Sequence, residues 1–87
     1  SILCFDKENT LDKRQKLRPD HLQYISKFKE KILLVGPILS ESEEPKGSLL
    51  IIDFNNRNEA NKFSKKDPYY LGGLFKRVEI YKFKKVF

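Results

Sequence analysis

The chain has 87 residues, a formal net charge of +6 and a single cysteine, Cys4. A chain of this length is expected to form one domain, residues 1–87, with a small core, and one cysteine excludes an internal disulfide. No apolar run approaches the roughly 18 residues that cross a membrane, and no signal peptide is evident. A single thiol in an apolar segment suits a reducing compartment, so we expect a cytoplasmic protein.

The positive charge alone could indicate a nucleic-acid partner or an acidic ligand. Fourteen of the 18 basic residues are lysines, and they are scattered along the chain rather than clustered. Such a distribution is typical of a solvated surface, which is the interpretation we favour. We therefore expect neither a nucleic-acid partner nor a membrane partner.

The main helix is predicted to begin at Pro19. Proline has a backbone φ close to the helical value and no N–H group, so it suits the first helical position, and it biases Arg18 away from the helical region. We therefore predict a helix over residues 19–30, preceded by a loose helical turn over 11–17. Spacings of three and four place one set of side chains on its inward face: Leu17, His21, Tyr24, Ile25 and Phe28.

The other segments complete a pattern of four strands and two helices. Strands are predicted over residues 2–5, 32–39, 49–54 and 74–87. A second helix is predicted over 57–66, with a loop at 40–48 and a turn at 69–73. This β-α-β-β-α-β order is that of the ferredoxin-like plait, an α+β fold in which two helices cover one face of a four-stranded antiparallel sheet. Because the middle strands are apolar on both sides, we expect the uncovered face to pack against a second copy, as a homodimer.

This topology is expected to bring two chemically useful side chains together. The start of the first helix and the end of the second share one rim of the plait, which places His21, the only histidine, near Asp67. The helix start favours a neutral imidazole, while a neighbouring carboxylate fixes its tautomer and leaves one ring nitrogen free to accept a proton. This is the arrangement of a general base with an orienting acid. The alternatives are a buried structural histidine and an aspartate that caps the turn at Pro68.

Four further residues are candidates for substrate binding. Arg14 and Arg18 flank the histidine and could hold an anion, because arginine makes forked hydrogen bonds to carboxylates. Ser48 could donate a hydrogen bond to a ligand, and Tyr69 could form a wall of the pocket. Each has an ordinary alternative, which is surface charge for the arginines, loop chemistry for the serine and core packing for the tyrosine.

The sequence predicts no metal site and no cofactor, because one histidine and one cysteine cannot build the usual zinc site and no phosphate-binding glycine motif occurs. Three functions stay open. The first is a cofactor-independent enzyme that moves a proton on a small anionic or aromatic substrate, and the second is a non-catalytic ligand-binding or structural dimer. The third, RNA binding, ranks low because residues 49–54 place aliphatic side chains where RNA recognition needs stacking rings.

The order of these residues resembles that of the YCII-related (YciI-like) family over nearly the whole chain. The matching motifs are Lys13-Arg14, Arg18-Pro19-Asp20-His21-Leu22, Gly36-Pro37, Gly47-Ser48, Asp67-Pro68-Tyr69 and Lys82-Phe83-Lys84-Lys85-Val86-Phe87. The resemblance implies a dimeric α+β barrel, with the His21–Asp67 pair as the active site in a pocket at the dimer interface. It also implies cofactor-free chemistry of the dehydrochlorinase, lyase or isomerase type. Asp20 stands where the family more often has a small residue, which adds a negative charge beside the histidine.

Overall fold

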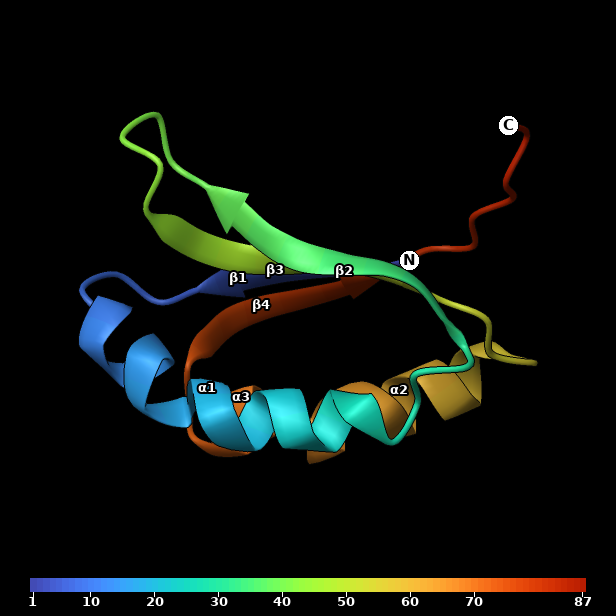
Figure 1. Ribbon diagram of the computed structural model, residues 1–87, viewed down its shortest axis with the longest axis horizontal. Helices are drawn as coiled ribbons and strands as arrows, with labels where there is room; N and C mark the ends of the chain where they lie inside the picture. Colours follow the sequence, from blue (N-terminus) through green and yellow to red (C-terminus); the bar gives the residue numbers. More distant parts are fainter.

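The computed structural model describes residues 1–87 and shows one sheet with all helices on the same face (Figure 1). The elements are β1 (Ile2–Asp6), α1 (Leu11–Ser26), β2 (Ile32–Leu39), β3 (Pro45–Ile52), α2 (Arg57–Lys66), α3 (Pro68–Leu71) and β4 (Phe75–Ile80). This order confirms the predicted α+β fold with its four-stranded antiparallel sheet. The short helix α3, formed where the sequence predicts a turn, is an addition to the two expected helices. None of the helices combines the length and the apolar character that crossing a bilayer demands.

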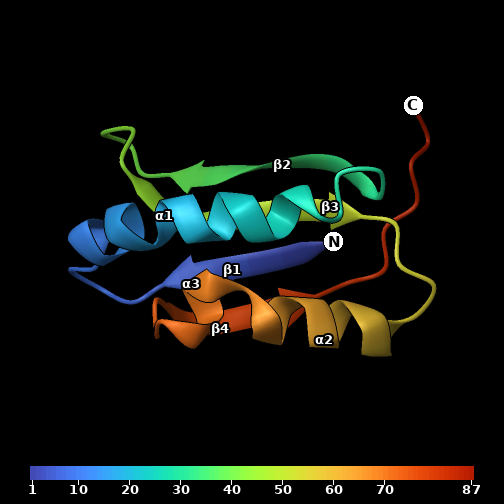
Figure 2. The ribbon, with the colours of Figure 1, turned by 60° about the horizontal axis from the view of Figure 1, so that its bottom comes forward.

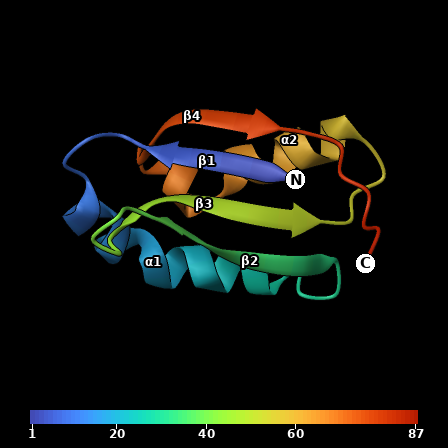
Figure 3. The same ribbon diagram turned by 90° about the horizontal axis from the view of Figure 1, so that it is seen from above.

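The sheet has the strand order β2-β3-β1-β4, with every neighbouring pair antiparallel, so the first strand in the sequence lies inside the sheet (Figure 3). Cys4 lies opposite Ser48 on β3 and opposite Val78 on β4. Because side chains alternate along a strand, Cys4 faces the helices, whereas Leu3 and Phe5 lie on the open face. The helix-covered face holds the core, whose buried members are Ile2, Cys4, Ile25, Leu50, Ala60 and Phe63.

Aromatic side chains fix the spacing between α1 and α2, which lie side by side across the sheet (Figure 2). The ring of Phe63 on α2 lies 5.3 Å from that of Tyr24 and 4.8 Å from that of Phe28, measured between ring centroids. The hydroxyl of Tyr24 also donates a hydrogen bond of 2.8 Å to the carbonyl oxygen of Phe63. Such ring pairs add about 0.5–1.5 kcal/mol each to the burial of their area, so they hold the two helices at a defined distance.

Helix α1 continues through Pro19, so the predicted break at Arg18 is wrong. A proline inside a helix costs about 3 kcal/mol because it removes a hydrogen bond and crowds the preceding turn. This cost is offset by burial on both sides of the proline, where Arg14, His21 and Ile25 all point inward. His21 therefore lies well inside the helix rather than in its first turn, and the predicted effect of the helix start on the imidazole is also wrong. The helix ends at Ser26, four residues before the predicted position.

The last two strands also differ from the prediction in their limits. Strand β3 begins at Pro45, so Gly47 and Ser48 belong to the sheet rather than to a loop. Strand β4 ends at Ile80, and residues 81–87 have no regular secondary structure. The reason is pairing: β4 has only β1 beside it, and Ile80 lies opposite Ile2, the first residue of β1. Tyr81 still exchanges backbone hydrogen bonds with Ser1, and the residues after it have no strand to pair with.

Gly47 is the position in the sheet where we expect a side chain to be least tolerated. A Cβ atom on Gly47 would lie 2.3 Å from the carbonyl oxygen of Cys4, a backbone atom that cannot rotate away. Gly47→Ala should therefore lower the free energy of unfolding by about 2 kcal/mol, measured by chemical denaturation. The matched control is Gly36→Ala, because a Cβ atom there meets nothing within 4 Å. Equal losses for the two variants would contradict this account.

Candidate active site

The imidazole of His21 on α1 contacts the carboxylate of Asp67, which lies at the junction of α2 and α3. Nδ1 of His21 lies 2.8 Å from Oδ1 of Asp67, and the exposed fractions of the two side chains are 6% and 3%. The same Oδ1 accepts a hydrogen bond of 2.9 Å from the backbone N–H of Tyr69, so Asp67 also caps α3. The structure thus brings the two residues together, and it also realises the capping role that the Asp-Pro pair suggests.

The carboxylate of Asp67 determines which ring nitrogen of His21 can accept a proton. A carboxylate only accepts hydrogen bonds, so a neutral imidazole must carry its proton on Nδ1 and its lone pair on Nε2. Nε2 makes no hydrogen bond, and no fully buried side-chain nitrogen or oxygen in the structure lacks a partner. Nε2 is therefore not fully buried, although the residue as a whole is only 5% exposed. An oriented imidazole with one open nitrogen can remove a proton from a ligand.

Tyr69 on α3 holds the imidazole by stacking. The ring centroids of His21 and Tyr69 are 3.9 Å apart and the ring planes differ by 13°. The guanidinium carbon of Arg14 lies 4.6 Å from the centroid of the same phenol ring. Burial raises the pKa of the Tyr69 hydroxyl, with Arg14 and Arg18 acting in the opposite direction, so the phenol stays protonated at neutral pH. Tyr69 belongs to α3, which lies beside α1 (Figure 2).

Arg14 is held by a network of hydrogen bonds beneath α1. Its Nε donates to Oδ2 of Asp6 at 2.7 Å, and its Nη2 donates to Oδ1 of Asp6 at 3.3 Å and to Oγ of Ser48 at 2.7 Å. Arg14 and Ser48 are both buried. The two predicted ligand-binding residues therefore lie in the same cluster as His21 and Tyr69, but their polar atoms bond mainly to each other and to Asp6.

Asp6 is the site residue that sequence reasoning missed. A signal for it was present, because alternation along β1 places Ile2, Cys4 and Asp6 on one face and the first two are apolar. A carboxylate on a buried face needs a cationic partner, since an unpaired buried charge is very costly. Arg14, eight residues later, was the natural candidate for that partner.

Arg18 differs from the other predicted site residues because it is exposed and makes no ion pair. It lies one turn before His21 on α1, and it is close enough to lower the pKa of the Tyr69 hydroxyl. Its guanidinium group is thus available to a ligand that approaches the imidazole.

Cys4 lies beneath the site and is chemically quiet. Burial raises the pKa of its thiol to about 12, and the charge of Asp67 acts in the same direction. The thiol is therefore protonated at neutral pH and cannot serve as a thiolate nucleophile. No group of three histidine, cysteine, aspartate or glutamate side chains is placed to hold a metal ion.

Two of the eight cavities in the structure lie at opposite ends of β1. One, of about 420 Å³, lies between the loop after β1 and the loop after β2, and Asp6 is the member of the site cluster that lines it. The other, of about 620 Å³, lies at the opposite end of β1. Neither cavity is lined by His21 or Asp67, so the imidazole faces neither of them.

A family model described as the YCII-related domain matches residues 1–84. The chain belongs to this family. Protein YciI of Escherichia coli O6:H1 and its namesake in Shigella flexneri are each 32% identical over 94 residues, which covers 99% of this chain and 96% of theirs. A protein of Haemophilus influenzae is 33% identical with the same coverage. These matches confirm the family resemblance that the sequence motifs indicated.

The chain is also similar to a solved structure of an enzyme. It is the 5-chloro-2-hydroxyhydroquinone dehydrochlorinase of Burkholderia phenoliruptrix AC1100, in complex with 2,5-dihydroxybenzoquinone. The two chains are 31% identical and superimpose with a TM-score of 0.82 over 93% of this chain and 90% of that chain. The YCII domain described here therefore shares the fold of a lyase-type enzyme.

We predict that Arg14→Lys disturbs His21 without unfolding the domain. Lysine keeps the charge but cannot make the forked contact with Asp6 or stack in the same way on Tyr69. His21 is the only histidine, so its ring C–H signals in an NMR spectrum are unambiguous. In the wild type these signals should be shifted upfield by the stacked phenol ring, and Arg14→Lys should return them toward free histidine. Arg18→Lys is the matched control, and unchanged His21 signals in Arg14→Lys would contradict a role for Arg14 in positioning the ring.

Proposed function

We propose that this YCII domain is a cofactor-independent acid–base enzyme of the lyase type, with His21 as the base and Asp67 as the residue that orients it. The observation that carries the proposal is the 2.8 Å contact between Nδ1 and Oδ1, together with an Nε2 atom that has no hydrogen-bond partner and is not fully buried. The similarity to a dehydrochlorinase supports the reaction class, because that name describes the loss of hydrogen chloride from a chlorinated ring.

The proposed reaction is an elimination from the keto tautomer of a hydroxylated ring, in which the carbon that bears the leaving group is tetrahedral. Nε2 of His21 takes a proton from an O–H or C–H group of the substrate. The electron pair left behind forms a new π bond, and the leaving group departs as an anion with its own bonding pair. The carboxylate of Asp67 stabilises the imidazolium, which then returns its proton to solvent or to the leaving group. A positioned base of this kind contributes about 10²- to 10⁴-fold to the rate.

The proposed substrate is a hydroxylated six-membered ring in its anionic form. Arg18 is exposed, lies one turn before His21 on α1 and would bind the ring's oxygen anion. Arg14, Ser48 and Tyr69 would act behind the imidazole, where they hold it in place. The quinone bound to the dehydrochlorinase supports this substrate class, since it is a small dihydroxylated ring.

The test is chloride release from 5-chloro-2-hydroxyhydroquinone, followed with a chloride-selective electrode. His21→Ala should lower kcat/KM by about 10²- to 10⁴-fold, because the proton acceptor is lost. Asp67→Asn should lower it by at least about tenfold through the wrong tautomer, while asparagine still caps α3. Asp53→Asn, at an exposed carboxylate remote from the site, should have no effect. A wild-type protein that binds the ring but releases no chloride would contradict the enzyme and favour a non-catalytic ligand-binding domain.

We also propose that the open face of the sheet packs against a second copy of the chain. Leu33 and Leu34 on β2 are 60% and 50% exposed, and Leu34 lies opposite Ile51 on β3. Figure 3 shows the face of the sheet that no helix covers. Neighbouring aliphatic side chains on such a face form the kind of patch that proteins usually cover. A twofold pairing of the two sheets would bury this patch on both copies at once.

Leu34→Glu should convert such a dimer into a monomer, because it would place two buried charges in the interface. Sedimentation equilibrium of the variant and of the wild type measures the change. The matched control is Leu71→Glu, at a leucine of α3 that is 70% exposed on the helix-covered side. A wild type that is monomeric at high micromolar concentration would contradict the dimer.

We further propose that the protein works in the cytoplasm. Support comes from Cys4, a free and buried thiol in a chain that has no second cysteine. Reducing compartments preserve thiols of this kind.

A further inference from the structure

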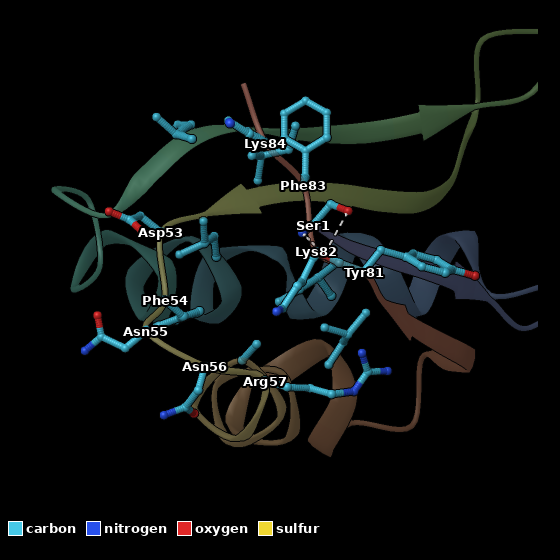
Figure 4. A pocket seen from close by; sticks show the side chains of 16 residues that line it. Ser1, Asp53, Phe54, Asn55, Asn56, Arg57, Tyr81, Lys82, Phe83 and Lys84 are labelled. Atoms are coloured by element: carbon cyan, nitrogen blue, oxygen red, sulfur yellow. Dashed lines mark hydrogen bonds between the residues drawn. The ribbon is translucent and has the colours of Figure 1, made fainter. Parts of the chain in front are cut away.

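The cavity of about 620 Å³ lies where β1 begins and β4 ends, far from the end of α2 that carries Asp67 (Figure 4). Its floor is apolar and includes Ile2, Ile52, Ile80 and Ala60. Ile2 and Ala60 are only 2% and 8% exposed, so this floor is recessed rather than part of the outer surface. The volume falls in the range of about 300–1,000 Å³ that is typical of small-molecule sites.

The rim of the cavity is positively charged. Arg57 at the start of α2 and Lys82 and Lys84 in the tail line it, and none of these three side chains is in an ion pair. Figure 4 shows Lys82 extending from the tail toward the start of α2. Asp53 is the one acidic residue in the lining. The rim therefore carries an excess of positive charge above an apolar floor.

The start of α2 is capped by side chains of the chain itself. Oδ1 of Asn56 already accepts a hydrogen bond of 2.9 Å from the N–H of Glu59, and the Glu59 carboxylate accepts one of 3.2 Å from the N–H of Asn55. Asn56 thus caps the helix start, and the Glu59 carboxylate adds a negative charge to its first turn, which disfavours a bound anion there. A ligand would therefore meet the side chains of Arg57 and Lys82.

We propose that this cavity is a second binding site, separate from the His21–Asp67 pair, for a small amphipathic anion, an aromatic ring that bears a carboxylate or sulfonate. The ring would lie on the isoleucine floor and the anionic group between Arg57 and Lys82. A second copy of the chain is a poorer occupant of this rim, because each copy has a net charge of +6. Since the tail supplies Lys82 and Lys84, occupancy would also hold the tail against α2.

The experiment compares two fluorescent probes with the same rings, 8-anilino-1-naphthalenesulfonate and the neutral N-phenyl-1-naphthylamine. Arg57→Gln and Lys82→Gln should each weaken binding of the sulfonate by about two- to fivefold, as removal of one partly exposed ion pair does, and should leave the neutral probe unchanged. Lys65→Gln with Lys66→Gln, exposed in the last turn of α2, is the matched control and should leave both probes unchanged. Added salt should weaken only the sulfonate.

NMR spectra locate the bound probe. The sulfonate should shift the amide signals of Asn55, Ala60 and Tyr81 and leave the ring signals of His21 in place. Shifts centred on Leu34 or on His21 would overturn the proposal, as would charge variants that bind the sulfonate as well as the wild type. Signals of the cavity residues that move with protein concentration alone would also overturn it, by showing that a second copy occupies the cavity. None of these outcomes depends on whether His21 catalyses an elimination.

Discussion

The carboxylate of Asp67 is buried at the point where α2 ends and α3 begins, and its Oδ1 atom is shared between two donors. Burying a charged group is costly unless hydrogen bonds replace the lost water, and here a backbone N–H group and the imidazole of His21 supply them. One of these donors starts α3 and therefore places Tyr69, while the other ties α1 to the same junction. The aromatic contacts of Phe63 with Tyr24 and Phe28 keep α1 and α2 at the spacing that this shared oxygen requires.

A chain of contacts leads from the Asp67 carboxylate to Asp6 on the sheet. Asp67 contacts His21, His21 stacks on Tyr69, and Tyr69 in turn lies against Arg14, whose guanidinium group is neutralised by Asp6. A buried ion pair of this kind is weak support for stability, because an apolar pair of the same volume often serves equally well. In a chain with so small a core, we infer that this cluster serves to hold the imidazole of His21 in place.

Much of this arrangement could be predicted from the sequence, because it follows from pattern and topology. The apolar runs gave the strand and helix order, and antiparallel helices on one face of a plait bring His21 and Asp67 to a common region. The course of α1 through Pro19 could not be predicted in the same way, since the local preference of a proline is outweighed by burial of Arg14 and His21 on either side of it. The role of Asp6 could be predicted only with knowledge of which face of β1 the helices cover. The end of β4 could not be predicted from its own residues, because it is set by the length of β1, the single strand beside it.

The central position of β1 has a consequence for how the molecule is made. This strand comes first in the sequence, yet both of its neighbours, β3 and β4, belong to the second half of the chain. During synthesis the strand must therefore wait, with its apolar side chains unshielded, until nearly the whole domain has left the ribosome. Pairing between distant segments slows folding because loop closure comes before any gain from contact. The sheet can therefore close only once β3 and β4 are available, and β1 is the segment that most needs protection in the interval.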